Sequence, residues 1–87
     1  MTTTADANVP AILSEALFAS NLQSSWLPTD FEIRTAIGQA KANLGVRGCL
    51  ERVAQEFGDH PELAVSRMRW ATEAVARLAS PSLSLAA

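Results

Sequence analysis

The residue types that most often carry chemistry are scarce in this chain of 87 residues, which has one histidine, His60, and one cysteine, Cys49. A zinc site needs about four closely spaced thiolate, imidazole or carboxylate ligands. The two residues are distant in sequence, and there is no second thiol. We therefore expect no metal site, and we interpret His60 as an exposed residue in the first turn of a helix.

Neither the cysteine nor the paired carboxylates indicate catalysis. Cys49 lies on an apolar helical face where it lacks the basic or histidine neighbour that lowers the pKa of a nucleophilic thiol. Glu51 and Glu56 each lie four residues after an arginine, Arg47 and Arg52, which is typical of a solvated helix face rather than an acid–base pair. The sequence therefore predicts a protein that is not an enzyme and that binds no cofactor.

The composition is that of one small globular domain. Hydrophobic residues make up 48% of the chain and charged residues 18%, and the net charge is −2. There is no apolar run long enough for a membrane helix, and the opening "MTTTADANVP" lacks the features of a signal peptide. A lone cysteine fits a reducing compartment. We expect a cytoplasmic protein.

The hydrophobic spacing predicts an all-α fold, a compact bundle of about four helices with short connections. Each expected helix has an apolar stripe that would face the core: Val9, Ile12, Leu13, Ala16 and Leu17 in residues 9–22; Ile33, Ala36, Ile37, Ala40 and Leu44 in residues 30–44; Val46, Leu50, Val53 and Phe57 in residues 46–57; and Ala64, Met68, Ala71, Val75 and Leu78 in residues 60–79. We expect residues 1–7 to be disordered, residues 8–79 to form the domain and residues 80–87 to form a flexible tail.

Helix boundaries are marked by polar residues and glycines. Thr29 with Glu32, and Asp59 with Glu62, have the spacing of a capping box. Gly45 is expected to end one helix in a left-handed conformation. Within the helix of residues 30–44, Gly38 costs about 1 kcal/mol relative to alanine, which suggests close packing of another helix there.

The stretch "VAQEFGDHPELAVSRMRWA", residues 53–71, resembles a bacterial helix-turn-helix segment. Ala54 stands where that motif has a small residue, Phe57 where it has a core residue, and Gly58 at the turn. The resemblance implies a transcriptional regulator whose second helix enters the major groove of DNA. The same glycine, followed by a capping box, is also what a plain corner between two core helices requires, and we favour that interpretation.

If the resemblance is functional, the residues that it assigns to DNA are Ser66, Arg67 and Arg69, since arginine can donate two hydrogen bonds to guanine. The acidic residues Asp59 and Glu62 would face the phosphates at the same end of the helix, which disfavours binding.

The last expected helix carries more apolar surface than one seam requires. Leu63, Trp70 and Ala74 form a second apolar column with Arg67 at its edge, and Trp26 is a further large aromatic residue in the connection "SSWLPT". Either these residues are covered by the bundle or they contact a partner. We predict a small binding or adaptor protein that acts through this helix on a protein partner or a second copy of itself, with a helix-turn-helix regulator as the alternative.

Overall fold

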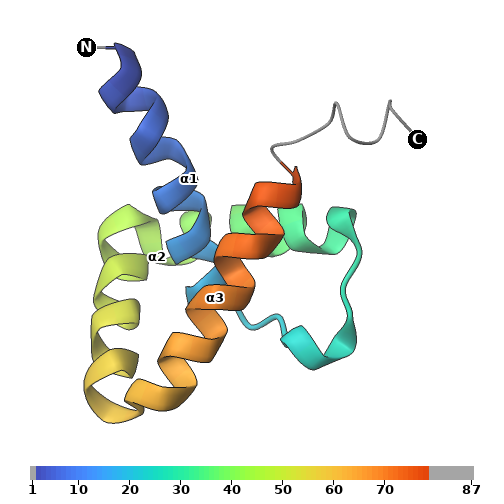
Figure 1. The fold of residues 1–87 in the computed structure, drawn as a ribbon, viewed down its shortest axis with the longest axis vertical. Coiled ribbons are helices and arrows are strands. Elements are labelled where there is room, and N and C mark those ends of the chain that lie inside the picture. The colour runs from blue at the N-terminus through green and yellow to red at the C-terminus, as the bar shows by residue number, and fades with distance from the viewer. Residues whose placement is uncertain (1, 79–87) are drawn as a thin grey trace.

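The computed structural model describes residues 2–78, which contain three α-helices, one short 3₁₀ turn and no strand. The elements are α1 (Thr2–Ala19), η1 (Ser24–Trp26), α2 (Asp30–Asp59) and α3 (Pro61–Leu78), and each helix packs against the other two (Figure 1). The expected all-α fold is confirmed, with three helices instead of four. The tail expected at residues 80–87 lies outside the described residues.

α1 begins further toward the N-terminus than the sequence indicated. It starts at Thr2 and includes residues 2–7, which we expected to be disordered, so Pro10 lies inside the helix rather than in its first turn. Residues 2–9 contain no glycine or proline that would end a helix. The first turns of α1 extend away from α2 and α3 (Figure 1).

α1 ends at Ala19, three residues before the expected end at Leu22. Ser20 accounts for the difference, because its backbone N–H and its hydroxyl both donate to the carbonyl of Leu17, at 3.1 and 2.6 Å. The hydroxyl also accepts from the N–H of Leu22 at 3.3 Å. Local bonds from serine to the backbone compete with helix hydrogen bonds in this way.

α2 begins at the predicted capping box. Thr29 Oγ1 accepts from the N–H of Glu32 at 3.2 Å, and a Glu32 carboxylate oxygen accepts from the N–H of Thr29 at 2.8 Å. Two of the unpaired N–H groups at the helix start are thus satisfied.

The break between the two helices expected over residues 30–57 is a bend inside α2. Gly45 has φ 73° and ψ 168°, values that are not helical and that belong almost entirely to glycine. This conformation differs from the left-handed cap that we expected. It turns residues 46–59, the second half of α2, away from residues 30–44, the first half (Figure 1).

The corner between α2 and α3 is a single residue, His60. Its N–H donates to the carbonyl of Glu56 at 2.7 Å, and its carbonyl accepts from the N–H of Ala64 at 2.8 Å. Asp59 is the last residue of α2, and no hydrogen bond of a second capping box joins it to Glu62 in the described chain.

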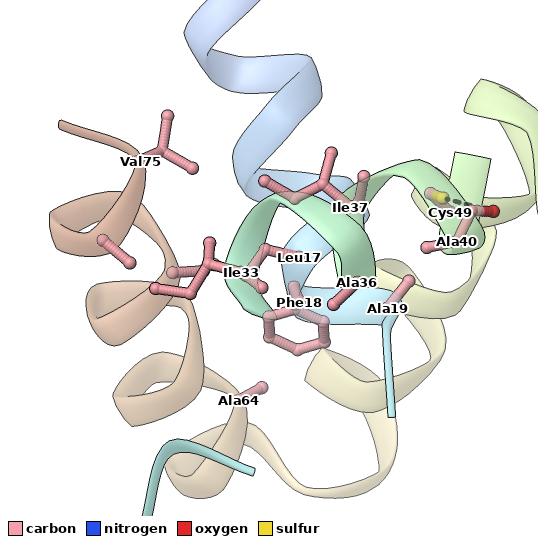
Figure 2. Packing of buried hydrophobic residues seen from close by; sticks show 13 residues of the cluster. Leu17, Phe18, Ala19, Ile33, Ala36, Ile37, Ala40, Cys49, Ala64 and Val75 are labelled. Carbon is pink, nitrogen blue, oxygen red and sulfur yellow. Dashed lines mark hydrogen bonds between the residues drawn. The ribbon is translucent and has the colours of Figure 1, made fainter. Parts of the chain in front are cut away.

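The core lies where the three helices meet, and it is rich in alanine. Leu17 of α1 and Ile33 of α2 are fully buried at its centre (Figure 2), and Ala71 and Val75 of α3 are buried in the same cluster. Small side chains allow the helix backbones to approach closely at native packing density. The stripes predicted for α3 and for the first half of α2 are confirmed, except that Leu44 is partly exposed.

The stripe predicted over residues 46–57 is confirmed only in part. Val53 packs against the core, and Phe57 is partly exposed but stacks on the buried Phe18. Val46 and Leu50 are about half exposed, and the buried residue of this segment is Cys49. Apolar residues at this spacing are compatible with either of two adjacent faces of the helix being buried. The bend at Gly45 determines which of the two faces packs against the core.

Gly38 is not a point of close helix packing. A methyl group added there would have no atom within 4 Å, and the residue is exposed. The expected reason for this glycine is therefore wrong.

Candidate functional site

The predicted apolar column on α3 is not a continuous exposed surface. Leu63, at the start of the helix, is 70% exposed, Trp70 is half-buried against the core, and Ala74 is completely buried. Of these three predicted partner-binding residues, only Leu63 presents most of its side chain to solvent. The helix itself is continuous from Pro61 to Leu78.

Arg67 is the residue of α3 whose contacts differ most from the predicted ones. Its Nε donates to the carbonyl of Phe18 at 2.8 Å, and its Nη2 donates to the carbonyls of Leu17 at 3.3 Å and Ser20 at 3.0 Å. The last carbonyls of a helix have no partner inside that helix. The guanidinium therefore caps the C-terminal end of α1, where a positive charge also interacts favourably with the helix dipole.

Two aromatic rings enclose the same guanidinium. Its central carbon lies 5.7 Å from the ring centre of Phe18 and 5.1 Å from that of Trp70, within the range of a cation–π interaction. Burial lowers the pKa of Arg67 below its ordinary value, and the negative charge of Glu56 opposes this effect. The Phe18 ring also stacks on Phe57 of α2, with ring centres 6.0 Å apart.

The residues assigned to DNA by the helix-turn-helix resemblance point in different directions. Ser66 and Arg69 are exposed on α3, whereas Arg67 reaches inward to α1. The exposed face that carries Ser66 and Arg69 also carries Glu62 and Glu73, since the four residues are spaced 4-3-4 along the helix. The face is therefore mixed in charge, and the turn before it is one residue rather than the three or four of a helix-turn-helix.

Three large and mostly exposed apolar side chains lie in the connection between α1 and α2 and at the start of α2. Trp26, Leu27 and Phe31 are 66%, 87% and 77% exposed. Trp26 was a predicted partner-binding residue, whereas Leu27 and Phe31 were missed. Phe31 could have been found from its phase, because it lies on the opposite side of the helix from the buried Ile33.

Leu27 adopts a left-handed backbone conformation with φ 52°. This conformation costs a non-glycine residue roughly 1 kcal/mol. Leu27 donates its N–H to the carbonyl of Ser24 at 3.2 Å, which closes η1 directly after Trp26. A strained backbone thus supports the segment that presents the indole.

Beside these side chains lies a largely apolar groove of about 470 Å³. One side of it is the end of α1 with the connection that follows, and the other is the first half of α2 along residues 31–44. Its apolar lining comes mainly from Ala19, Leu22, Trp26, Phe31, Ala36 and Ala40. A volume of this size is within the range of ligand-binding pockets.

Two charged residues also line the groove, Glu32 at the start of α2 and Arg52 from its second half. One carboxylate oxygen of Glu32 is engaged in the capping box with Thr29. Arg52 forms no ion pair within 4.0 Å in the described part of the chain. The arginine is thus the charged group with the greater capacity for a new partner.

Cys49 and His60 do not form a reactive pair in this fold. The Cys49 thiol is buried and donates weakly to the carbonyl of Ala40 across 3.7 Å (Figure 2), whereas His60 is exposed at the corner before α3. Burial raises the pKa of the thiol, and Glu15 adds to this rise while Arg52 and Lys41 oppose it. A raised pKa keeps the sulfur protonated and a poor nucleophile at neutral pH.

Within residues 2–78 no three His, Cys, Asp or Glu side chains are grouped so that they could hold a metal ion. The helices described over that range include none with the length and apolar character needed to cross a bilayer.

No protein-family model, curated protein or solved structure matches this chain.

Proposed function

We propose that this chain is a non-enzymatic, cytoplasmic binding or adaptor protein that holds an apolar segment of a partner protein in the groove between α1 and α2. The observation that carries the proposal is the position of Trp26 and Phe31, both mostly exposed and both lining an apolar groove. The single cysteine, Cys49, is buried and forms no disulfide, which supports the assignment to the cytoplasm.

The exposure of these rings has a physical cost. Each large aromatic side chain left in water forgoes roughly 2 kcal/mol of burial free energy. A few such rings gathered around a concavity are typical of a protein-binding surface, because tryptophan and other aromatic residues supply most of the binding energy at interface centres. The surface used is then the α1–α2 groove rather than the column on α3, although Leu63 offers a second exposed apolar contact.

The experiment is a selection of phage-displayed 16-residue peptides on the immobilised full chain. Affinities of the enriched peptides are then measured for the wild type, Trp26→Ala, Phe31→Ala and Leu63→Ala. The last variant is the matched control, since Leu63 is as exposed as the two rings and lies outside the groove.

We expect each groove variant to weaken peptide binding by about tenfold or more, and Leu63→Ala to change it by less than twofold. If no peptide is enriched, or if binding depends on Leu63 and not on the two rings, the groove is not the binding surface. Light scattering between 1 and 100 µM in the same series identifies a second copy as the partner if the wild type dimerises and Trp26→Ala does not.

A further inference from the structure

The groove differs in charge along its length. Glu32 lies at the start of α2 next to Phe31, and the connection with Trp26 adjoins this end. Arg52 belongs to the second half of α2, one turn beyond Cys49, whose sulfur contacts the carbonyl of Ala40. In Figure 1 the connection and the second half of α2 lie on opposite sides of the molecule. The groove lining thus takes its acidic residue, Glu32, from the start of α2 and its basic residue, Arg52, from the second half of the same helix.

The length and form of the groove fit a helix. Its lining follows α2 from Phe31 to Leu44, a rise of about 20 Å at 1.5 Å per residue. An amphipathic helix of about 13 residues has the same length, and its side chains can interdigitate with those of α2. An extended peptide would gain no backbone pairing, because residues 2–78 contain no strand whose edge it could join.

We propose that the groove takes an amphipathic helix of a partner protein that carries an acidic side chain where it meets Arg52. This inference rests on the proposed function and adds the chemistry of the partner segment. An acidic residue is favoured over a basic one because the Arg52 guanidinium has no ion-pair partner in the described residues, whereas Glu32 already accepts a hydrogen bond from Thr29.

The charges around Arg52 are of both signs. Glu56 lies one turn after Arg52, and its charge acts on the buried Arg67. Lys41 is exposed on the first half of α2 and, like Arg52, contributes positive potential around Cys49. Arg52 is the one of these two cations that lines the groove, and its positive charge attracts a carboxylate from a partner helix.

The test repeats the peptide selection on the wild type and on Arg52→Glu. We use a library of 16-residue peptides with leucine or phenylalanine fixed at helical spacing and all other positions random. The matched control is Arg69→Glu, which makes the same charge reversal on an exposed arginine outside the groove. Peptides enriched on the wild type are then titrated against all three proteins at 0.05 and 1 M NaCl.

We expect wild-type selections to enrich aspartate or glutamate at a fixed offset from the apolar positions, and Arg52→Glu selections to enrich lysine or arginine there. For a wild-type peptide, Arg52→Glu lowers the affinity about fivefold in low salt, the effect of replacing an exposed attraction by a repulsion. High salt reduces this difference, and Arg69→Glu leaves the affinity within twofold.

Enriched peptides without a charge preference at any position, or with an affinity that is the same for the wild type and Arg52→Glu, overturn the inference while leaving the proposed function intact. Peptides rich in proline, which cannot form a helix, overturn the helical partner. Loss of the proposed function has a different signature, since it appears as binding that is indifferent to Trp26→Ala and Phe31→Ala.

Discussion

The Arg67 side chain of α3 donates from Nε to the backbone carbonyl of Phe18, at 2.8 Å, and its guanidinium also lies against the Phe18 ring. One residue of the last helix thus holds the end of the first helix, 49 positions earlier in the chain. Together with the bonds to Leu17 and Ser20, this contact joins the two terminal helices at the point where the connection to α2 begins.

Replacing Arg67 is therefore expected to destabilise the fold. Arg67→Ala removes three charge-assisted hydrogen bonds to carbonyls and two aromatic contacts, so the free energy of unfolding should fall by about 2 kcal/mol. Arg67→Lys keeps the charge but not the planar fork of donors, and it should recover less than half of the loss. Urea unfolding followed by tryptophan fluorescence measures both changes.

The control for Arg67 is Arg69→Ala, because Arg69 is exposed on the same helix and makes no hydrogen bond in the described residues. Its effect on the free energy of unfolding should stay below about 0.5 kcal/mol. Equal effects of the two substitutions would mean that the guanidinium does not hold α1 in solution.

Two glycines of α2 should respond to alanine in opposite directions. Gly45→Ala forces a side chain into a conformation that only glycine adopts readily, and we expect a loss of about 2 kcal/mol. Gly38→Ala lies in regular helix with open space around it, and it should stabilise the protein by about 0.5–1 kcal/mol. Thermal unfolding followed by circular dichroism distinguishes the two, and a gain in stability from Gly45→Ala would contradict the bend.

The sequence predicts the helices well where the signal is local. The capping box of Thr29 and Glu32 and the stripes of α3 and of the first half of α2 are local patterns, and the structure confirms them. The stripe of residues 46–57 is confirmed at Val53 but not at Val46 and Leu50, because the bend at Gly45 changes which face of the following residues meets the core.

The candidate site was predictable only in part, because it depends on how helices pack and not on local patterns alone. Trp26 stood out by its size, but the groove beside it forms between α1 and α2, and its existence depends on how two helices pack. Arg67 shows a second limit of local patterns. Its type and position suggested an interface or DNA, whereas its partners are carbonyls nearly fifty residues away that no local pattern reveals.

Cys49 should make stability depend on pH above neutrality. Burial raises the pKa of its thiol in the folded chain. The contribution of the protonated thiol to the free energy of unfolding is therefore complete below the pKa of the unfolded chain, and it is lost as the pH rises through the pKa of the folded chain. The free energy of unfolding of the wild type should therefore fall relative to that of Cys49→Ala above about pH 9. If the free energies of unfolding of the two proteins differ by a constant amount from about pH 7 to about pH 10.5, the ionisation of the thiol is not coupled to folding.

The two tryptophans should separate binding from stability. Trp70 packs on the core and on Arg67, and Trp70→Ala should cost about 2 kcal/mol, somewhat less than a fully buried ring. Trp26 is mostly exposed, so Trp26→Ala should leave the free energy of unfolding within about 0.5 kcal/mol while weakening peptide binding. Urea unfolding of both variants makes the comparison, and a large loss of stability in Trp26→Ala would assign that ring to the fold.

The helix-turn-helix alternative predicts a result that the groove does not. If α3 reads DNA, Ser66→Ala and Arg69→Ala must weaken binding to duplex DNA, because those two side chains are exposed on it, and the affinity must fall steeply with salt. Glu62 and Glu73 lie on the same face and repel phosphates, so we expect no binding even at about 50 mM salt, where phosphate contacts are stronger than at physiological salt. Fluorescence anisotropy with random-sequence duplexes measures this directly. Arg67→Ala is unsuitable as a test of DNA binding because Arg67 also supports the fold. If the wild type binds duplex DNA with a salt-sensitive affinity, and Arg69→Ala abolishes that binding without changing the free energy of unfolding, the regulator is favoured over the adaptor.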